Sequence, residues 1–91
     1  MKLENILLAD NFSVKLCDFG MSESSEETLY HNCGSETYRA PEIGSMLRNY
    51  QGFKGIQADI FSLGVILFSM HVGSMPFRVA NVNTDRYFNL I

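Results

Sequence analysis

The chain has 91 residues, of which 46% are hydrophobic, and it carries a formal charge of −3 at pH 7. Ninety-one residues form one domain at most, and this hydrophobic fraction is typical of a globular chain rather than a disordered one. No cluster of lysine and arginine is present, so we expect neither a nucleic-acid partner nor an anionic membrane surface.

The cysteines and the apolar stretches indicate in which cellular compartment the protein is expected. Cys17 and Cys33 form no C-x-x-C pair, which favours packed thiols over a zinc site. The N-terminus lacks the basic-then-apolar order of a signal peptide. The longest apolar stretch, Ile60 to Val72, has 13 residues, whereas crossing a bilayer takes about 20. We therefore expect a soluble protein in the cytoplasm or elsewhere inside the cell, with no membrane partner.

Two short strands are the first predicted elements. Asn5-Ile6-Leu7-Leu8 is an apolar run that stops at the turn signal Ala9-Asp10-Asn11, and Val14-Lys15-Leu16-Cys17 alternates roughly between apolar and polar residues. Together they predict a β-hairpin. From Met21 to Thr37 the chain is rich in Ser and Glu and has no apolar period, which predicts a loop of about 17 residues.

Helices dominate the second half. A short helix is predicted over Pro41–Leu47, because proline favours the first helical position, and Gly52 and Gly55 then mark a surface loop. From Ala58 to Val72 apolar residues occupy all sides of a predicted helix, which should then be buried on all sides. Asn83-Thr84-Asp85 is typical of a helix cap and predicts a last helix running to Ile91.

Three short motifs follow one another along the chain. They are Lys2-x-x-Asn5, Asp18-Phe19-Gly20 and Ala40-Pro41-Glu42. A given tripeptide occurs by chance in about 1% of chains of this length. Their joint order, with strands before the second motif and a long loop after it, removes chance as an explanation.

The chemistry that fits these residue types is phosphoryl transfer. A transferring γ-phosphoryl group carries negative charge that Mg²⁺ and cations must neutralise. Mg²⁺ prefers oxygen ligands, and it is usually held by one or two protein groups together with phosphates and water. Asp18 and Asn5 supply such oxygens, and the hairpin between them should bring both to one end of the strand pair. Lys2 provides a point charge for the γ-phosphate.

On these motifs the chain resembles the protein kinase family, whose catalytic loop ends in an Asn and whose later motifs are D-F-G and A-P-E. The resemblance implies that Asn5 and Asp18 bind metal and cofactor, and that Phe19 and Gly20 complete the D-F-G motif. Lys2 matches a loop lysine found in serine/threonine kinases and usually lacking in tyrosine kinases, so it implies a serine/threonine kinase.

The resemblance extends over the rest of the chain. The run from Gly34 to Arg39 is similar to the family's substrate-facing loop, in which Ser35 falls at the Thr or Ser that bonds the catalytic Asp and Lys. In that family Glu42 pairs with an arginine of the final helices. Asp59, at the start of the long helix, bonds the catalytic-loop backbone there.

The implied fold is α+β: part of the mainly helical large lobe of a protein kinase, with a short β-hairpin, an activation loop and a central buried helix. Residues 1–91 would form a partial domain. The small lobe, the last helices and the catalytic Asp, which belongs immediately before Met1, would lie outside it.

The implied function is transfer of the γ-phosphoryl group of ATP to serine or threonine of a protein substrate, with ATP and Mg²⁺ as cofactors. The parent domain would perform it, and the 91 residues alone should be inactive. A non-catalytic kinase remnant that acts as a protein-interaction module is the alternative.

Regulation by phosphorylation of the loop is a further implication. Related kinases often carry Thr or Ser three residues before the glycine of the substrate loop, and this chain has His31 there. The nearby candidate phosphorylation sites are Ser24, Ser25, Thr28 and Tyr30. Glu23, Glu26 and Glu27 are interpreted mainly as a solvated loop face, and alternatively as a phosphate mimic. The arginine that usually receives the phosphate is not among the 91 residues.

The long helix also predicts self-association. Taken out of its lobe, the Ile60–Val72 segment lacks neighbours for its second face and should expose more apolar surface than a soluble monomer usually does. We expect the isolated chain to aggregate, to self-associate or to be molten.

Overall fold

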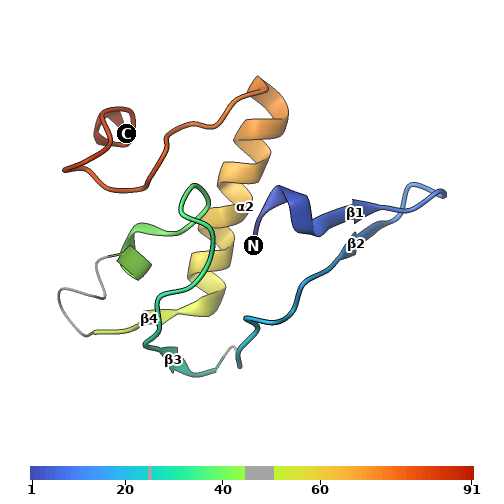
Figure 1. Cartoon of the computed structure of the whole chain (residues 1–91), viewed down its shortest axis with the longest axis horizontal. Helices are drawn as coiled ribbons and strands as arrows, with labels where there is room; N and C mark the ends of the chain where they lie inside the picture. Colours follow the sequence, from blue (N-terminus) through green and yellow to red (C-terminus); the bar gives the residue numbers. More distant parts are fainter. Residues whose placement is uncertain (25, 45–50) are drawn as a thin grey trace.

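The computed structural model describes residues 1–24, 26–44 and 51–91. In these residues the structure has two small two-stranded sheets, two short 3₁₀ helices and the long helix α2, Gly55–Val72 (Figure 1). Residues 41–44 form a further helical turn. The helix predicted over Pro41–Leu47 is thus present at its start, and its last three residues lie outside the described part of the chain.

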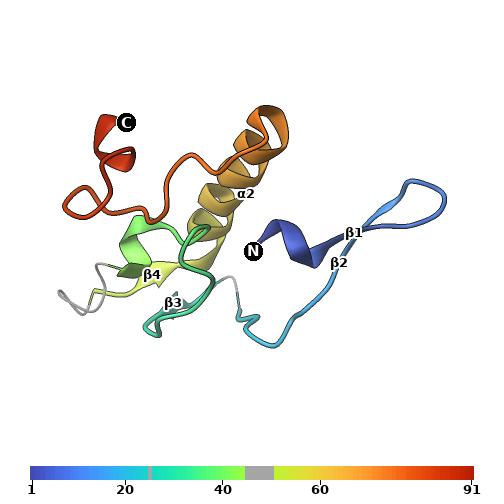
Figure 2. The ribbon, with the colours of Figure 1, turned by 45° about the horizontal axis from the view of Figure 1, so that its top comes forward.

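The predicted hairpin is confirmed. The 3₁₀ helix η1, Leu3–Asn5, leads into β1, Ile6–Leu8, which pairs antiparallel with β2, Val14–Leu16. In the turn, the Asn11 side-chain oxygen accepts hydrogen bonds from the Ser13 backbone N–H at 3.1 Å and from its hydroxyl at 2.7 Å. Both views show the hairpin projecting away from α2 (Figures 1 and 2).

A second pair of strands lies inside the region predicted to be all loop. β3, Thr28–Leu29, pairs antiparallel with β4, Phe53–Lys54, and β4 runs directly into α2. The prediction of one irregular loop from Met21 to Thr37 is therefore wrong at these two residues. Two residues are too few to show an alternating pattern, and their partner lies 25 residues further along the chain.

The helix α2 begins and ends at glycines. It starts at Gly55, three residues before the predicted start, and ends at Gly73, whose φ of 83° is the left-handed conformation that glycine adopts without strain. The Gly73 N–H donates to the Ser69 carbonyl at 2.8 Å and closes the last turn. The predicted end of the helix is confirmed.

The core consists of two apolar clusters against one side of α2. Tyr38, Val65, Ile66, Phe77 and Ala80 form the first, and Ala40, Ile43, Phe53 and Ala58 form the second. Phe61 packs against both, with its ring centre 6.0 Å from that of Phe77. The two clusters thereby attach the segments before and after α2 to the same helix.

The opposite side of α2 is exposed, so the prediction of a helix buried on all sides is wrong in this structure. Only Ala58, Ser62, Val65 and Ile66 of the helix are buried. The exposed apolar face comprises Ile56, Ile60, Leu63, Leu67, Phe68, Met70 and Val72. By length and composition alone α2 could also cross a membrane, a test that core helices of soluble proteins pass as well.

The segment after α2 ends in the 3₁₀ helix η2, Phe88–Leu90, rather than in the predicted longer helix. The predicted cap is nevertheless present at Asp85, which is buried. Its carboxylate accepts hydrogen bonds from the backbone N–H groups of Tyr87 and Phe88 at 2.9 and 3.1 Å. It also accepts from Arg78 and Val79 at 2.7 and 3.0 Å, so the same carboxylate anchors the preceding loop.

Asp85 should make stability depend on pH. Burial opposes its ionisation, but the four backbone N–H donors outweigh burial and hold the pKa of Asp85 below its ordinary value near 3.8. Because the folded pKa is lower than the unfolded one, the ionised carboxylate stabilises the fold at neutral pH, and this contribution is lost as pH falls through the folded pKa. We expect Asp85→Asn to lower resistance to urea at pH 7, with a gap from the natural protein that narrows toward pH 2.

Asp10→Asn, in the exposed hairpin turn, is the matched control and should change little at either pH. A gap that stays constant from pH 7 to pH 2 would contradict the role assigned to the Asp85 charge.

Candidate active site

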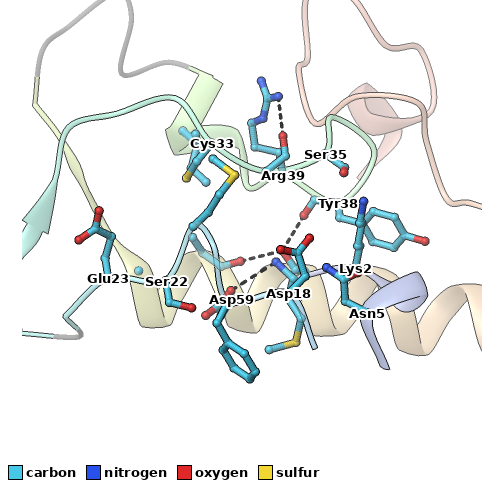
Figure 3. A pocket seen from close by; sticks show the side chains of 18 of the residues that line it. Lys2, Asn5, Asp18, Ser22, Glu23, Cys33, Ser35, Tyr38, Arg39 and Asp59 are labelled. Carbon is cyan, nitrogen blue, oxygen red and sulfur yellow. Dashed lines mark hydrogen bonds and ion pairs between the residues drawn. The ribbon is translucent and has the colours of Figure 1, made fainter. Parts of the chain in front are cut away.

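A cavity of about 690 Å³ lies between η1, the end of β2 with the loop after it, and the first half of α2. Several of the residues singled out in the sequence line it, among them five that Figure 3 labels: Lys2, Asn5, Asp18, Ser35 and Asp59. They come from four separate segments. The structure therefore brings these residues to one cavity, while the catalytic and binding roles assigned to them stay predictions.

The hairpin places Asn5 and Asp18 at the same end of the strand pair. The backbone N–H of Cys17 donates to the Asn5 carbonyl at 2.9 Å, which extends the β1–β2 ladder by one bond beyond the strands. Asp18 is the next residue. This is the arrangement that the sequence predicted from the turn between the two strands.

Asp18 itself has a left-handed backbone, with φ of 64°. That region costs residues other than glycine roughly 1–2 kcal/mol, although Asp and Asn enter it more readily than most. A strained carboxylate residue at the mouth of a cavity is a frequent feature of functional sites. Its side chain is exposed rather than packed, so its oxygens are available to a ligand.

Asp18 and Asn5 are the two predicted metal ligands, and both line the cavity. Among the described residues no group of three or more His, Cys, Asp or Glu side chains could hold a metal ion. Mg²⁺ usually takes one or two protein oxygen ligands alongside phosphate oxygens, and the assignment of Asp18 and Asn5 to this role stays a prediction.

The loop from Gly34 to Arg39 is attached to α2 through a buried polar contact. The hydroxyl of Ser62 donates to the Tyr38 carbonyl at 2.7 Å, and both residues are buried. The backbone N–H of Tyr38 donates to the Ser35 carbonyl at 3.0 Å, and Arg39 donates to the Gly34 carbonyl at 2.8 Å. These bonds set the course of the chain around Ser35.

The Tyr38 side chain connects this loop to the segment that carries Lys2 and Asn5. Burial, together with the neighbouring carboxylate of Glu4, raises the pKa of Tyr38 above its ordinary value. Neither Tyr38 nor Ser62 was predicted from the sequence to support the site. A serine inside an otherwise apolar helix was the available signal, since such a hydroxyl must find a partner when it is buried.

Removing the Ser62 hydroxyl should loosen this loop. Ser62→Ala leaves the buried Tyr38 carbonyl without that donor, which costs about 1–3 kcal/mol. We expect the Ser62→Ala variant to unfold at a correspondingly lower concentration of urea. Ser69→Ala is the control, because the Ser69 hydroxyl bonds the part-buried Val65 carbonyl of its own helix and, at an exposed position, the Met75 sulfur, and its loss should be clearly smaller. Equal losses for the two variants would contradict the argument.

Asp59 lines the cavity from the first turns of α2. Its carboxylate oxygen is 3.6 Å from the backbone nitrogen of Met1, and more than half of its side chain is exposed. The resemblance had assigned Asp59 to the backbone of the catalytic loop. In the structure it lies against the first residue of the segment that carries Lys2 and Asn5.

The remaining predicted residues are more dispersed. Phe19 lines the cavity but is 65% exposed, and Gly20 follows it in a turn. Glu42 is half-buried and makes a polar interaction of its own. Of the candidate phosphorylation sites, Ser24 and Tyr30 are exposed and Thr28 is half-buried in β3. Ser25 lies outside the described residues.

Both cysteines are free thiols at the cavity wall. Burial is the main reason that the pKa of Cys33 is raised, and the nearby Arg39 opposes this only in part. A raised pKa means less thiolate, and the thiolate is the reactive form. Cys33 is thus better suited to packing than to nucleophilic chemistry.

The comparisons with known proteins agree on the family. The family profile of the protein kinase domain matches residues 1–90. The chain is 41% identical over 87 residues to CBL-interacting serine/threonine-protein kinase 13 of Arabidopsis thaliana, which covers 90% of this chain and 16% of that protein. It is 42% identical over 79 residues to NUAK family SNF1-like kinase 1 of Mus musculus, covering 85% of this chain and 11% of that protein.

The chain therefore spans less than a fifth of the length of either of these two relatives. The match of the family profile extends from η1 to η2 and so includes every segment that lines the cavity. With its short antiparallel hairpin and its central helix, the chain belongs to the protein kinase family and has the fold of part of a protein kinase domain.

Proposed function

We propose that these residues form the nucleotide- and substrate-facing part of a protein kinase that transfers the γ-phosphoryl group of ATP to serine or threonine of a protein. The observation that carries the proposal is the cavity in which a lysine, an amide, a carboxylate and a hydroxyl meet: Lys2, Asn5, Asp18 and Ser35. The names of the relatives, among them serine/threonine-protein kinases, support the choice of acceptor.

In this proposal each residue has one task. Asp18 and Asn5 would hold Mg²⁺ together with the phosphates of ATP, and the bound ion would neutralise charge that develops on the transferring group. Lys2 would place its ammonium beside the γ-phosphate. Ser35 would position the acceptor hydroxyl through the loop that Tyr38 and Ser62 fix to α2.

The 91 residues by themselves should not catalyse phosphoryl transfer. The chain spans only 16% of the length of the Arabidopsis kinase and 11% of the length of the mouse kinase that it resembles. We therefore propose that the activity belongs to a longer polypeptide that includes these residues.

The test is transfer of labelled γ-phosphate to a mixture of Ser-, Thr- and Tyr-containing peptides. We expect the polypeptide as the cell makes it to label Ser or Thr peptides, and the 91-residue chain to stay at background. Labelling of tyrosine only, or no labelling by the natural polypeptide, would contradict the proposal.

A non-catalytic interaction module is the second candidate function. The observation that favours it is the exposed apolar face of α2, which includes Ile60 and Leu67 at more than 60% exposure each. Such a protein would bind a partner without binding Mg·ATP. A natural polypeptide that shows no nucleotide binding in the presence of Mg²⁺ would favour the module, whereas binding with turnover would exclude it.

A further inference from the structure

The loop between β2 and the helical turn at residues 41–44 contains a pair of side chains that attract each other only when a histidine is charged. Nε2 of His31 lies 3.9 Å from a carboxylate oxygen of Glu23, and less than half of each side chain is exposed. Glu23 precedes β3 in the chain, and His31 follows it. A contact between them therefore ties the segment that enters β3 to the segment that leaves it.

The ring of Phe53 holds the His31 ring in place. The two rings meet edge to face, with their centres 6.4 Å apart and an angle of 65° between their planes. Phe53 is buried in the second apolar cluster, against which Leu29 and Cys33 also pack. Because Phe53 lies in β4, which runs directly into α2, His31 rests on a fixed part of the fold. Glu23, by contrast, is exposed.

The distance between the two groups makes their contact depend on the charge of the imidazole. A hydrogen bond from nitrogen to oxygen spans about 2.7–3.2 Å, so at 3.9 Å a neutral imidazole gains little from the carboxylate. A protonated imidazole is attracted to the carboxylate by charge alone. Histidine is the side chain that ordinarily changes its charge between about pH 5 and pH 8, a range in which a glutamate carboxylate is ionised. The attraction is therefore present at the acidic end of this range and is lost as pH rises.

Other charged groups of the neighbouring elements are directed elsewhere or lie farther away. Lys54 follows Phe53 in β4, so its side chain lies on the other face of the strand, where it donates to the Thr28 hydroxyl at 2.9 Å. Among the residues that the structure describes, Glu23 is within ion-pair distance of His31. The remaining titratable groups around this part of the loop are Glu26, Glu27, Tyr30 and Cys33 of the loop itself, Arg39 of the segment after it and Asp59 of α2.

We propose that His31 and Glu23 form a pH-sensitive switch on this loop: protonated His31 binds Glu23 and fixes the loop against β4, and neutral His31 releases it. The switch moves one proton and forms no covalent bond. At acidic pH the imidazole takes the proton from the solvent, and at alkaline pH it returns the proton. Because the pair is partly exposed, the switch shifts the opening equilibrium of the loop by about two- to fivefold, the range of exposed ion pairs.

The switch acts on the wall of the larger cavity. Ser22, Glu23 and Ser24 line the cavity from the segment before β3, and Asn32 and Cys33 line it from the segment after β3; Figure 3 labels three of them. Fixing these two segments to each other limits the positions that this wall can take. The site is therefore better ordered at acidic pH. This consequence for the site rests on the proposed function, whereas the contact between the two side chains does not.

The first experiment measures the loop itself. Hydrogen exchange of the amides of residues 28–29 and 53–54, which form the strand pair between the two tied segments, is followed in the natural polypeptide at about pH 5.5 and about pH 8. Protection factors remove the intrinsic dependence of exchange on pH. We expect protection to be about two- to fivefold greater at the acidic pH. Equal protection at both values, or greater protection at the alkaline one, would overturn the proposal.

Variants assign the effect to the pair. His31→Gln and Glu23→Gln each remove one charge and should abolish the difference between the two pH values. His31→Arg is charged at both and keeps a planar group against Phe53, so its protection should be the same at both. The matched controls are Glu27→Gln, in the same loop, and His71→Gln, exposed near the end of α2, and both should keep the difference. A difference that persists in any of the first three variants, or disappears in a control, would overturn the role of the pair.

The consequence for the site has its own measurement. In the natural polypeptide the KM for a peptide substrate should rise about two- to fivefold from the acidic to the alkaline pH, and in His31→Arg it should stay constant. The same rise in both proteins would refute this consequence. Hydrogen exchange needs neither ATP nor a peptide substrate, so it decides on the switch whatever the outcome of the γ-phosphate transfer assay.

Discussion

Asp18→Ala should abolish most of the phosphoryl transfer by the polypeptide that contains these residues. Asp18 supplies the carboxylate among the two proposed metal ligands, and a bound metal contributes several kcal/mol of charge stabilisation in the transition state. We expect kcat/KM to fall by about a thousandfold, since each 1.4 kcal/mol changes a rate tenfold. The loss in kcat/KM is measured by steady-state kinetics with a Ser- or Thr-containing peptide.

The left-handed backbone of Asp18 requires a second variant. Alanine at a φ of 64° is strained, so a loss of activity in Asp18→Ala could come from a distorted backbone. Asp18→Gly removes the carboxylate and accepts that conformation. We expect Asp18→Gly to be as inactive as Asp18→Ala, and Asp18→Asn, which keeps an oxygen ligand, to be intermediate. Recovery of activity in Asp18→Gly would refute the role of the carboxylate.

The second large effect concerns the 91-residue chain alone, which should self-associate. Seven apolar side chains of α2 form an exposed face in this structure, with Ile60 and Leu67 exposed by 63% and 66%. Soluble monomers rarely expose contiguous apolar patches of more than a few hundred Å². We expect sedimentation velocity of the purified chain to show oligomers or aggregates rather than a single monomer species.

Charge placed on that face should reverse the association. Ile60→Lys and Leu67→Lys, two turns apart on the exposed side of α2, are expected to raise the monomer fraction. Ile66→Lys is the opposite control, because Ile66 is only 2% exposed, and burying an unpaired charge there should unfold the chain. A natural chain that sediments as a monomer and unfolds cooperatively would refute the expectation.

Local signals made part of this fold predictable from sequence. Asp10 and Asn11 marked the hairpin turn, and Gly73 marked the end of α2, because both turn residues and helix ends are set by neighbours in the sequence. The placement of Asn5 and Asp18 at one end of the hairpin followed from that turn alone.

The predictions that were wrong concern features that depend on contacts between residues far apart in the sequence. The two-residue strands β3 and β4 carry no pattern of their own, and the pair of Thr28 with Lys54 becomes visible only in three dimensions. The length of the last helix was also wrong, since the structure has only the 3₁₀ helix Phe88–Leu90 after the cap at Asp85. The one-sided burial of α2 depends on which segments pack against it, and composition does not contain that information.

The central claim is that Asn5 and Asp18 hold a metal–nucleotide complex. Calorimetric titration of ATP into the natural polypeptide, with Mg²⁺ varied from absent to saturating, tests it most directly. We predict that affinity for ATP rises with Mg²⁺ in the natural protein and that this rise disappears in the variant carrying both Asn5→Ala and Asp18→Gly. The same dependence on Mg²⁺ in the natural protein and in the variant would contradict the claim.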